Sequence, residues 1–285
     1  MRDADASGTG GRLVRIEDPA DPRASAYLSI RERDLARRDG RFVVEGEVVL
    51  RLVAERSPGL VRSVLVAEPR LPRIAPILPR LPAAVPVLVA GQAVADSIAG
   101  FHLNRGILAI ADRPAAESLE TLLAVAPAHA TVPVLVGLSN HDNVGGVFRN
   151  AAAFGAPFCV LDGESCDPFY RKAVRVSVGG SVVVPHVRVG DLDAALDVLV
   201  AAGFSLVALT PRPDAPPVSE VPAGRRVALL LAAEGSGLPD RIIARATPAR
   251  IPMAAGFDSL NVAVAAGIAL ATLFDPAGRG KPAPG

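Results

Sequence analysis

The sequence predicts an α/β protein with two domains, a smaller one at the N-terminus followed by a larger one. Its 285 residues, of which 50% are hydrophobic, can form one large or two ordinary domains. Short apolar runs alternate with helical segments along the chain, which is typical of sheets flanked by helices. In the second half these runs are continuously apolar, as expected for strands buried on both faces of a parallel sheet.

Composition indicates where the domains begin and end. The Gly-, Ser- and Asp-rich residues 1–11 predict a flexible tail, and residues 276–285 predict a second one. We expect the N-terminal domain over residues 12–113 and the C-terminal domain over residues 130–275. The prolines and acidic residues between the two domains predict a linker over residues 114–129, with a possible short helix in it.

The pattern of apolar residues predicts the individual elements. In the N-terminal domain it predicts helices over residues 21–38 and 45–55, and strands over residues 42–44, 63–67, 85–89 and 105–111. In the C-terminal domain it predicts helices over residues 145–154, 192–202, 239–245 and 260–273. The strands predicted there cover residues 132–138, 158–161, 182–187, 205–209, 227–231 and 249–253.

The charges nearly balance, with 30 basic and 29 acidic residues, but they are unevenly distributed. Residues 1–113 carry 17 basic and 14 acidic groups, a net charge of +3, and residues 114–285 carry 13 and 15, a net charge of −2. This difference favours an anionic partner for the first domain, although an ordinary solvated surface explains it equally well.

Composition also excludes some functions. The two cysteines and four histidines are scattered without metal-ligand spacing, so we expect no metal. Residues 1–12 lack the apolar core of a signal peptide, and the apolar run over residues 262–274 is too short to cross a bilayer. We therefore expect no membrane partner, and a soluble cytoplasmic protein with reduced thiols.

Three segments share one arrangement, in which a strand-like apolar run leads through a polar loop with glycine into a helix. They are VPVLVGLSNHDNVGGVFRNAAAFGA (132–156), VALLLAAEGSGLPD (227–240) and IPMAAGFDSLNVAVAAGIAL (251–270). A complete dinucleotide-binding fingerprint and a phosphate-binding loop ending in Gly-Lys-Ser/Thr are both absent. In the second segment Glu234 ends a buried run, where a carboxylate needs a partner, so it is either a site residue or a capping or surface acid.

The other two segments also place polar residues where chemistry is possible. A helix that begins at Gly145 and Gly146 would offer its free amides to a phosphate. Arg149, about one turn further, could bind the same phosphate, although it could also be an ordinary surface arginine. Ser259 can cap the last helix or serve a site. Asn261 is expected one turn inside that apolar helix, where a buried amide needs partners.

In order, the segments read N-x-G-x-x-x-R-x-A-x-x-F-G, A-E-G-x-G-L and I-P-M-x-x-x-x-x-S-L-N-V. Together they resemble the three motifs of the SpoU (TrmH-like) branch of the SPOUT RNA methyltransferases, over roughly residues 131–274. The resemblance implies a trefoil-knot domain, S-adenosylmethionine as cofactor, and methyl transfer to a ribose 2′-hydroxyl of structured RNA, with rRNA preferred to tRNA. Residues 42–50 and 105–111 resemble the L30e-like RNA-binding domain common in this family.

The resemblance also implies roles for single residues. Arg149 matches the catalytic arginine and Asn143 the family's asparagine, while Glu234, Ser259 and Asn261 would position the target ribose. Because a guanidinium only donates hydrogen bonds, we expect Arg149 to hold a phosphate and lower the pKa of the hydroxyl, rather than to act as a base. The implied cofactor contacts are Ala232, which stands where the family usually has glycine, with Gly235, Ile251, Leu260, Met253, Leu209 and Thr210.

The helix from residue 260 to 274 is apolar nearly all round, so it needs cover on every side, and only DPAGRGKPAPG follows it. We expect a homodimer that covers this helix, as in the family, with Arg149 close to the partner's cofactor site. Two other functions stay open. One is a non-catalytic RNA-binding protein with a relic fold, suggested by Ala232, and the other is a base-modifying SPOUT methyltransferase.

Overall fold

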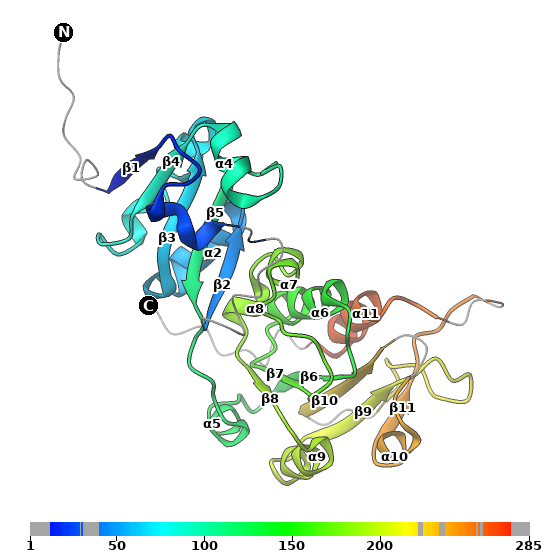
Figure 1. The fold of residues 1–285 in the computed structure, drawn as a ribbon. Helices are drawn as coiled ribbons and strands as arrows, with labels where there is room; N and C mark the ends of the chain where they lie inside the picture. The colour runs from blue at the N-terminus through cyan, green and yellow to red at the C-terminus, as the bar shows by residue number, and fades with distance from the viewer. Residues whose placement is uncertain are drawn as a thin grey trace. The chain divides into compact units, whose positions relative to one another are not determined.

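The computed structural model describes residues 12–28, 30, 40–221, 225–233, 237–254, 256 and 259–274. Its contacts divide the chain into two compact units, drawn as ribbons in Figure 1. Unit 1 comprises Met1–Pro114 and Phe169–Arg175, and unit 2 comprises Ala115–Pro168 and Val176–Gly285. The two expected tails and the site candidates Glu234 and Gly235 lie outside the described residues.

Unit 1 is built on a five-stranded sheet in the order β1-β4-β3-β5-β2. Strands β1, β4 and β3 are parallel, whereas β5 runs antiparallel to both β3 and β2. Only β1 was not predicted, because Arg15 interrupts its short apolar run. The strands are β1 (Leu13–Ile16), β2 (Arg41–Glu45), β3 (Val61–Ala67), β4 (Val87–Ala90) and β5 (Ile107–Asp112).

The helix predicted over residues 21–38 is wrong in its first part. Residues 21–28 form the short 3₁₀ helix η1 (Pro22–Tyr27) and become extended at Leu28, whereas residues 31–38 lie outside the described residues. The buried Tyr27 holds this turn on the sheet, since its hydroxyl shares a 2.7 Å hydrogen bond with Ser63. The other helical elements of the N-terminal part are α2 (Glu47–Arg56), η2 (Pro58–Leu60), η3 (Glu68–Arg70), α3 (Leu71–Ile74), η4 (Leu78–Arg80) and α4 (Gln92–Ala99).

Residues Phe169–Arg175 belong to unit 1 although they come late in the sequence. Arg171 Nη1 donates to Oε2 of the buried Glu45 at 2.7 Å, and the guanidinium lies 4.7 Å from the centre of the Phe101 ring. This buried carboxylate is therefore paired, as a buried charge must be. The helix that carries Arg171, α7 (Arg171–Val176), was not predicted.

Unit 2 holds a six-stranded sheet in the order β11-β9-β10-β6-β7-β8, with every neighbouring pair parallel. Strand β10 lies between β6 and β9, which both precede it in the sequence. Alternate residues of β10 enter the cores on opposite faces, Leu229 on one side and Leu230 on the other, which confirms the predicted doubly covered parallel sheet. The strands are β6 (Ala130–Val136), β7 (Cys159–Leu161), β8 (His186–Arg188), β9 (Ser205–Leu209), β10 (Arg226–Ala232) and β11 (Thr247–Ala249).

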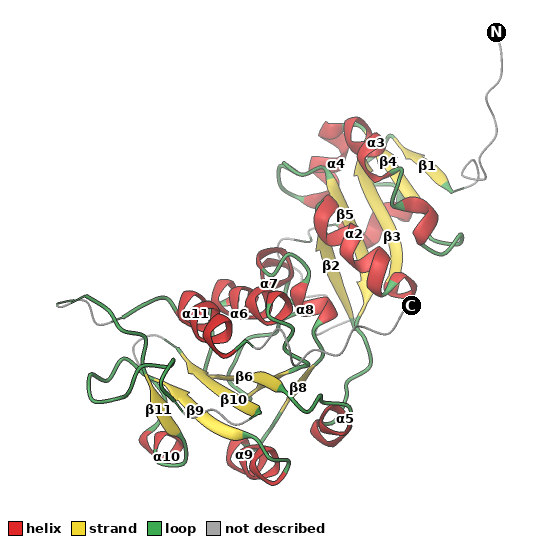
Figure 2. Ribbon diagram, turned by 180° about the vertical axis from the view of Figure 1, so that it is seen from behind, coloured by secondary structure: helices red, strands yellow, loops and turns green. Residues whose placement is uncertain are grey.

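Helices cover both faces of this sheet, as the two opposite views in Figures 1 and 2 show. One face carries α6 (His141–Ala153), α8 (Gly180–Val183) and α11 (Val262–Leu273). The other face carries α5 (Leu119–Ala124), α9 (Leu192–Ala201) and α10 (Asp240–Ile243).

Several parts of unit 2 differ from the predicted elements, among them the strand predicted over residues 249–253, which lies at Thr247–Ala249 as β11. The short helix expected as a possibility in the linker is present as α5, whose Leu119 and Leu122 are buried in the core. The strand predicted over residues 182–187 is wrong at its start, where α8 packs on α6 before β8 begins. Gly180 permits this packing, because a Cβ there would lie 2.7 Å from the carbonyl oxygen of Phe148.

The described part of the chain has no helix long and apolar enough to cross a membrane. Within the same residues, no group of three or more His, Cys, Asp or Glu side chains could hold a metal ion. The trefoil knot implied by the resemblance stays a prediction.

Candidate active site

The carboxyl ends of β9 and β10 open into a cavity of about 420 Å³. Ligands of parallel α/β sheets bind at this edge, beyond the carboxyl ends of the strands. The segment that leads into α11 closes the cavity from the other side. Strand β9 and the residue after it contribute Leu209 and Thr210, β10 contributes Leu231 and Ala232, and the segment before α11 contributes Ile251, Met253, Ser259 and Leu260.

All described residues that the resemblance assigned to the cofactor line this one cavity. Ser259, assigned to the target ribose, lines it as well. Most of the lining is apolar, and Thr210 brings one buried hydroxyl. Such a lining suits a small ligand with a flat apolar part and a few polar groups.

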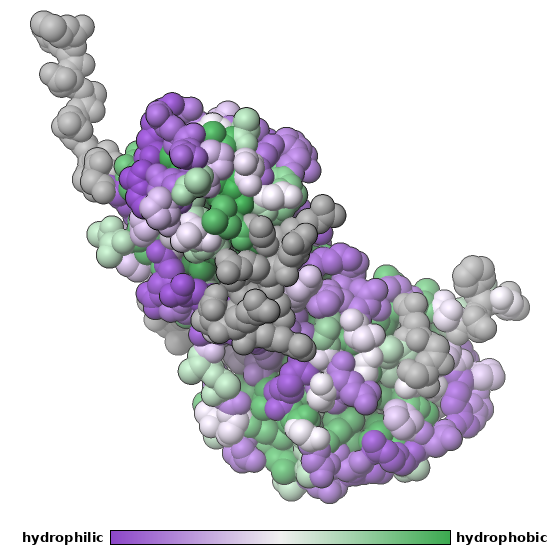
Figure 3. Space-filling view, in the orientation of Figure 1, coloured by the Kyte–Doolittle hydropathy of each residue, from purple (hydrophilic) through white to green (hydrophobic). Residues whose placement is uncertain are grey.

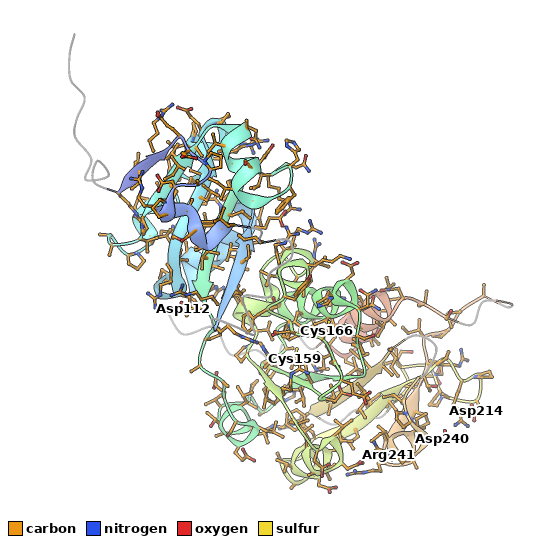
Figure 4. All side chains as sticks on the ribbon, in the orientation of Figure 1. Asp112, Cys159, Cys166, Asp214, Asp240 and Arg241 are labelled. Atoms are coloured by element: carbon orange, nitrogen blue, oxygen red, sulfur yellow. The ribbon has the colours of Figure 1, made fainter. Side chains whose placement is uncertain are left out.

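Two charged residues of the cavity, Arg212 and Asp240, were not predicted. Arg212 donates through Nε and Nη2 to the two carboxylate oxygens of Asp214, at 3.1 and 2.9 Å. This hydrogen bonding lowers the pKa of Asp214 and raises that of Arg212. Figure 4 labels Asp214 and Asp240 on the β11 side of unit 2. The signal that could have found Arg212 is its place just after a strand at the ligand-binding edge of a parallel sheet.

The N-cap of α11 is Asn261 and not Ser259. Asn261 Oδ1 accepts hydrogen bonds from the amides of Ala263 and Val264, at 2.9 and 3.3 Å. The helix therefore begins at Val262, and the expectation that Asn261 lies one turn inside it is wrong. Because Asn261 satisfies the first amides, Ser259 is not needed as a cap and lies in the cavity lining.

The side chain of Asn261 also joins α11 to α6. Its Nδ2 donates to Oδ1 of Asn143 at 2.8 Å, although the two residues are 118 positions apart. Asn143 lies in the first turn of α6, which begins at His141 and is capped by Asn140. Two residues that the resemblance assigned to the site are therefore in direct contact.

The helix expected to begin at Gly145 begins four residues earlier, so its glycines do not form an N-terminal anion site. Gly146 instead lets α6 approach α11, because a Cβ there would lie 2.4 Å from the Cβ of Ala263. Asn150 strengthens the same contact, since its Nδ2 donates to the carbonyl oxygen of Ala263 at 2.6 Å. The glycine is thus required by packing against a helix more than a hundred residues away.

Arg149 lies away from the cavity. It is exposed and lines an open groove of about 440 Å³ between α6 and α11, together with Phe154, Val264 and Ile268. Val264 is 52% exposed and Ile268 39% exposed, so two large apolar side chains one helical turn apart face solvent in this groove. The structure therefore brings Asn143, Asn261, Ser259 and the cofactor candidates together, but it places Arg149 of the same chain at a different surface.

The loop before α6 is held by the loop that follows β7. Asp162 Oδ2 accepts from the amide of Gly137 at 2.8 Å, and the buried Ser165 Oγ accepts from the amide of Leu138 at 3.1 Å. Arg188 fixes the second loop by donating to the carbonyl oxygens of Asp162 and Ser165. These bonds position the start of α6 and hence Asn143.

Neither cysteine is suited to nucleophilic catalysis. Cys159 is buried in the core, and its burial raises the pKa of its thiol. Burial also raises the pKa of Cys166, to about 11. Both side chains therefore stay in the thiol form near neutral pH, and the thiolate is the reactive form.

The geometry defines a class of protein, namely a parallel α/β domain with a mostly apolar cofactor cavity at the carboxyl ends of its inner strands. Residues 130–271 match the model of the SpoU rRNA Methylase family. The chain is also 38% identical over 261 residues to a protein of Mycobacterium tuberculosis named as an uncharacterized tRNA/rRNA methyltransferase, and the match covers 88% of each chain. The chain belongs to the SpoU family, as its three motifs predicted.

Two other known proteins are similar along nearly the whole chain. The 23S rRNA (guanosine(2553)-2′-O)-methyltransferase RlmP of Bacillus subtilis is 25% identical, and the match covers 90% of this chain and 97% of that protein. The AdoMet-bound structure of an rRNA methyltransferase from Sinorhizobium meliloti has the same fold, with a TM-score of 0.75 at 24% identity over 92% of this chain and 98% of that one. The protein is thus an RNA methyltransferase of this family.

Proposed function

We propose that this chain methylates a ribose 2′-hydroxyl of structured RNA, and that the RNA is ribosomal rather than transfer RNA. The observation that carries the proposal is the Asn143–Asn261 hydrogen bond, which joins the rim of the cofactor cavity to the helix that carries Arg149. The relative from Bacillus subtilis, named as a 2′-O-methyltransferase of 23S rRNA, supports the proposed atom and the proposed RNA. An rRNA substrate would place the protein in the cytoplasm.

The residues of the cavity divide into two groups in this proposal. The apolar group, with Leu209, Ile251 and Leu260, would hold the cofactor, and Thr210 would offer it a hydroxyl. Bound S-adenosylmethionine supplies the methyl group in electrophilic form. Ser259 lines the cavity, and Asn261 lies between the lining residues Leu260 and Val262. In the proposal Ser259, Asn261 and its hydrogen-bond partner Asn143 would orient the target ribose. Glu234 shares this role in the proposal, on the resemblance alone.

Arg149 would hold an RNA phosphate through two parallel hydrogen bonds. Its positive charge would lower the pKa of the nearby 2′-hydroxyl and so help the oxygen to lose its proton. Much of the rate enhancement would come from holding the oxygen in line with the methyl group, since such positioning can contribute roughly 7–11 kcal/mol. Arg149 therefore has to reach a ribose that lies at a cofactor cavity.

We also propose that Arg149 reaches the cavity of a second copy of the chain. It does not line the cavity of its own chain, and its groove carries the exposed Val264 and Ile268. Burying two such side chains against a partner is favourable, at about 1.5–3 kcal/mol for each full burial. A homodimer through this groove would cover α11 and would complete the site with a residue from each chain.

Methylation of unmodified RNA tests the proposal. The protein is incubated with methyl-labelled S-adenosylmethionine and total RNA, and the labelled nucleoside and its position are then mapped. We expect one 2′-O-methylnucleoside in rRNA. A labelled base would show a base-modifying enzyme, a label in tRNA would correct the substrate, and cofactor binding without transfer to any RNA would contradict the proposed activity.

A further inference from the structure

We propose that Arg70 and Arg105 of unit 1 form a binding site for the phosphate backbone of the substrate RNA. The inference rests on the proposed function, because it names the contact through which unit 1 would hold the same RNA. Hydrophilic side chains form much of the visible surface of unit 1 in Figure 3. The two arginines differ from most others in this unit in their partners and in what lies beneath them.

Most of the described arginines of unit 1 lie within salt-bridge distance of a carboxylate. Arg41 and Arg62 both lie beside Asp112, and Arg171 and Arg175 both lie beside Glu45. Among the described residues, no carboxylate lies within salt-bridge distance of Arg70 or of Arg105. Further pairs join Arg15 to Glu68, Arg23 to Asp21, Arg51 to Glu47, Arg73 to Glu47 and Arg80 to Glu55.

Both arginines lie directly on glycine backbone. A Cβ on Gly46 would lie 2.9 Å from Cδ of Arg105, and a Cβ on Gly106 would lie 2.6 Å from Cγ of Arg70. Both glycines have a positive φ, +92° and +63°, which other residues rarely adopt. The stems of the two arginines therefore lie close to the backbone, in space that any other side chain at these positions would occupy.

The strand ends fix both glycines in place. The amide of Gly46 donates to the carbonyl oxygen of Ile107 at 2.9 Å, and the carbonyl oxygen of Gly106 accepts from the amide of Ala67 at 2.8 Å. Arg70 Nη2 also reaches the carbonyl oxygen of Asn104 at 3.5 Å. The two arginines thus lie at the end of the sheet where β2 and β3 finish and β5 begins.

Phosphate groups are the ligands that these two arginines suit. A guanidinium without a carboxylate partner offers a planar pair of donors that matches a phosphate. Phosphate contacts dominate RNA affinity and carry little sequence information. Phe101 lies in the same loop as Arg105, and the guanidinium of Arg171 lies over one face of its ring. That face is therefore not available to stack on a base. We therefore assign backbone binding, rather than base recognition, to Arg70 and Arg105.

The test compares the full chain with the variant R70Q/R105Q and with the single control variant R56Q. Arg56 is exposed at the end of α2 and also has no carboxylate partner among the described residues, but it does not lie on either glycine. Affinity for a structured rRNA fragment is measured over a series of salt concentrations. Cofactor affinity and the melting temperature are measured in parallel and should stay unchanged in both variants.

We expect R70Q/R105Q to lose more than roughly tenfold in RNA affinity at low salt, and to reduce the slope of log K against log[salt] by about 1.4, or about 0.7 for each lost phosphate contact. R56Q should change neither quantity by as much. If R70Q/R105Q kept the RNA affinity and the salt slope of a wild type that methylates RNA normally, this site alone would be overturned. The same would follow if R56Q lost as much RNA affinity as R70Q/R105Q. A wild-type chain that binds and methylates no RNA would overturn the proposed function with it. Binding of acidic polypeptide in preference to RNA would assign the two arginines to a protein partner instead.

Discussion

The cofactor cavity and the Arg149 groove use two faces of the same helix. Val262 and Ala265 of α11 line the cavity, whereas Val264 and Ile268 line the groove. The cavity is enclosed by residues of one chain, but the groove leaves large apolar side chains in solvent. In our proposal α11 lacks a polar face because both faces bind something, one face the cofactor and the other a second copy of the chain.

The largest expected effect comes from removing the charged group of the groove. Arg149→Ala should lower methyl transfer by roughly 10²–10³-fold, the usual effect of removing one group that stabilises charge in a transition state. Cofactor affinity, measured by calorimetry, should not change, because Arg149 does not line the cavity. Arg225→Ala is the matched control. Arg225 is exposed just before β10, at the amino end of the strand, whereas the cavity lies at the carboxyl end. If Arg149→Ala also weakened cofactor binding, the assignment of Arg149 to the RNA rather than to the cofactor would be wrong.

The apolar residues of the groove should control assembly. The variant Val264→Glu/Ile268→Glu should sediment as a monomer and lose most activity, because two carboxylates cannot be buried unpaired in an interface. It should still bind the cofactor. Val200→Glu is the control, since Val200 is similarly exposed, at 51%, but lies on α9 across the sheet. A wild-type chain that is monomeric and fully active would show that the groove is not a dimer interface needed for activity.

Filling the cavity should weaken cofactor binding and leave the dimer intact, which is the opposite of the effect expected in the groove. Ala265→Leu adds bulk to the cavity lining and should weaken cofactor binding by about 1–3 kcal/mol, the usual effect of a misfit in an apolar pocket, without changing the oligomeric state. Ala271→Leu is the control on an exposed position of the same helix. If Ala265→Leu also dissociated the dimer, the two faces of α11 would not be independent.

The smallest effect should come from the residue that links the two regions. Asn261→Ala removes the cap of α11 and the bond to Asn143, and should lower the free energy of unfolding by about 1 kcal/mol. Asn261→Asp keeps the capping acceptor but loses the donor to Asn143. We expect it to restore most of the stability and to leave methylation reduced. Equal activity in Asn261→Asp and wild type would show that the Asn143 bond is not needed for positioning.

The sequence predicted regular elements better than it predicted their ends. Strand β9 was predicted at its observed residues, because a continuous apolar run between polar neighbours has little other explanation in a parallel sheet. The start of α6 was placed too late, since glycine disfavours helix interiors and Gly146 appeared to be a boundary. Its real cause is the close contact with Ala263, which local sequence does not show.

The same limit applies to the site. The motifs predicted the residues that line the cavity, because these follow strands whose carboxyl ends meet at one edge. Ser259 and Asn261 are both good caps, and the choice between them could not be made from the helix alone. Asn261 gains a hydrogen bond to Asn143 from another part of the chain. The separation of Arg149 from the cavity was equally hidden, since it depends on how α6 and α11 pack.

Mixing two inactive variants tests most directly whether one chain's groove serves the other chain's cavity. Arg149→Ala supplies a working cavity, and Ala265→Leu supplies Arg149, at a cofactor concentration where Ala265→Leu alone is inactive. In a two-fold dimer with shared sites, random 1:1 exchange of subunits should restore about a quarter of the wild-type activity, because half of the dimers are mixed and each has one complete site. No activity after verified exchange would show that each Arg149 serves its own chain, and would contradict the account.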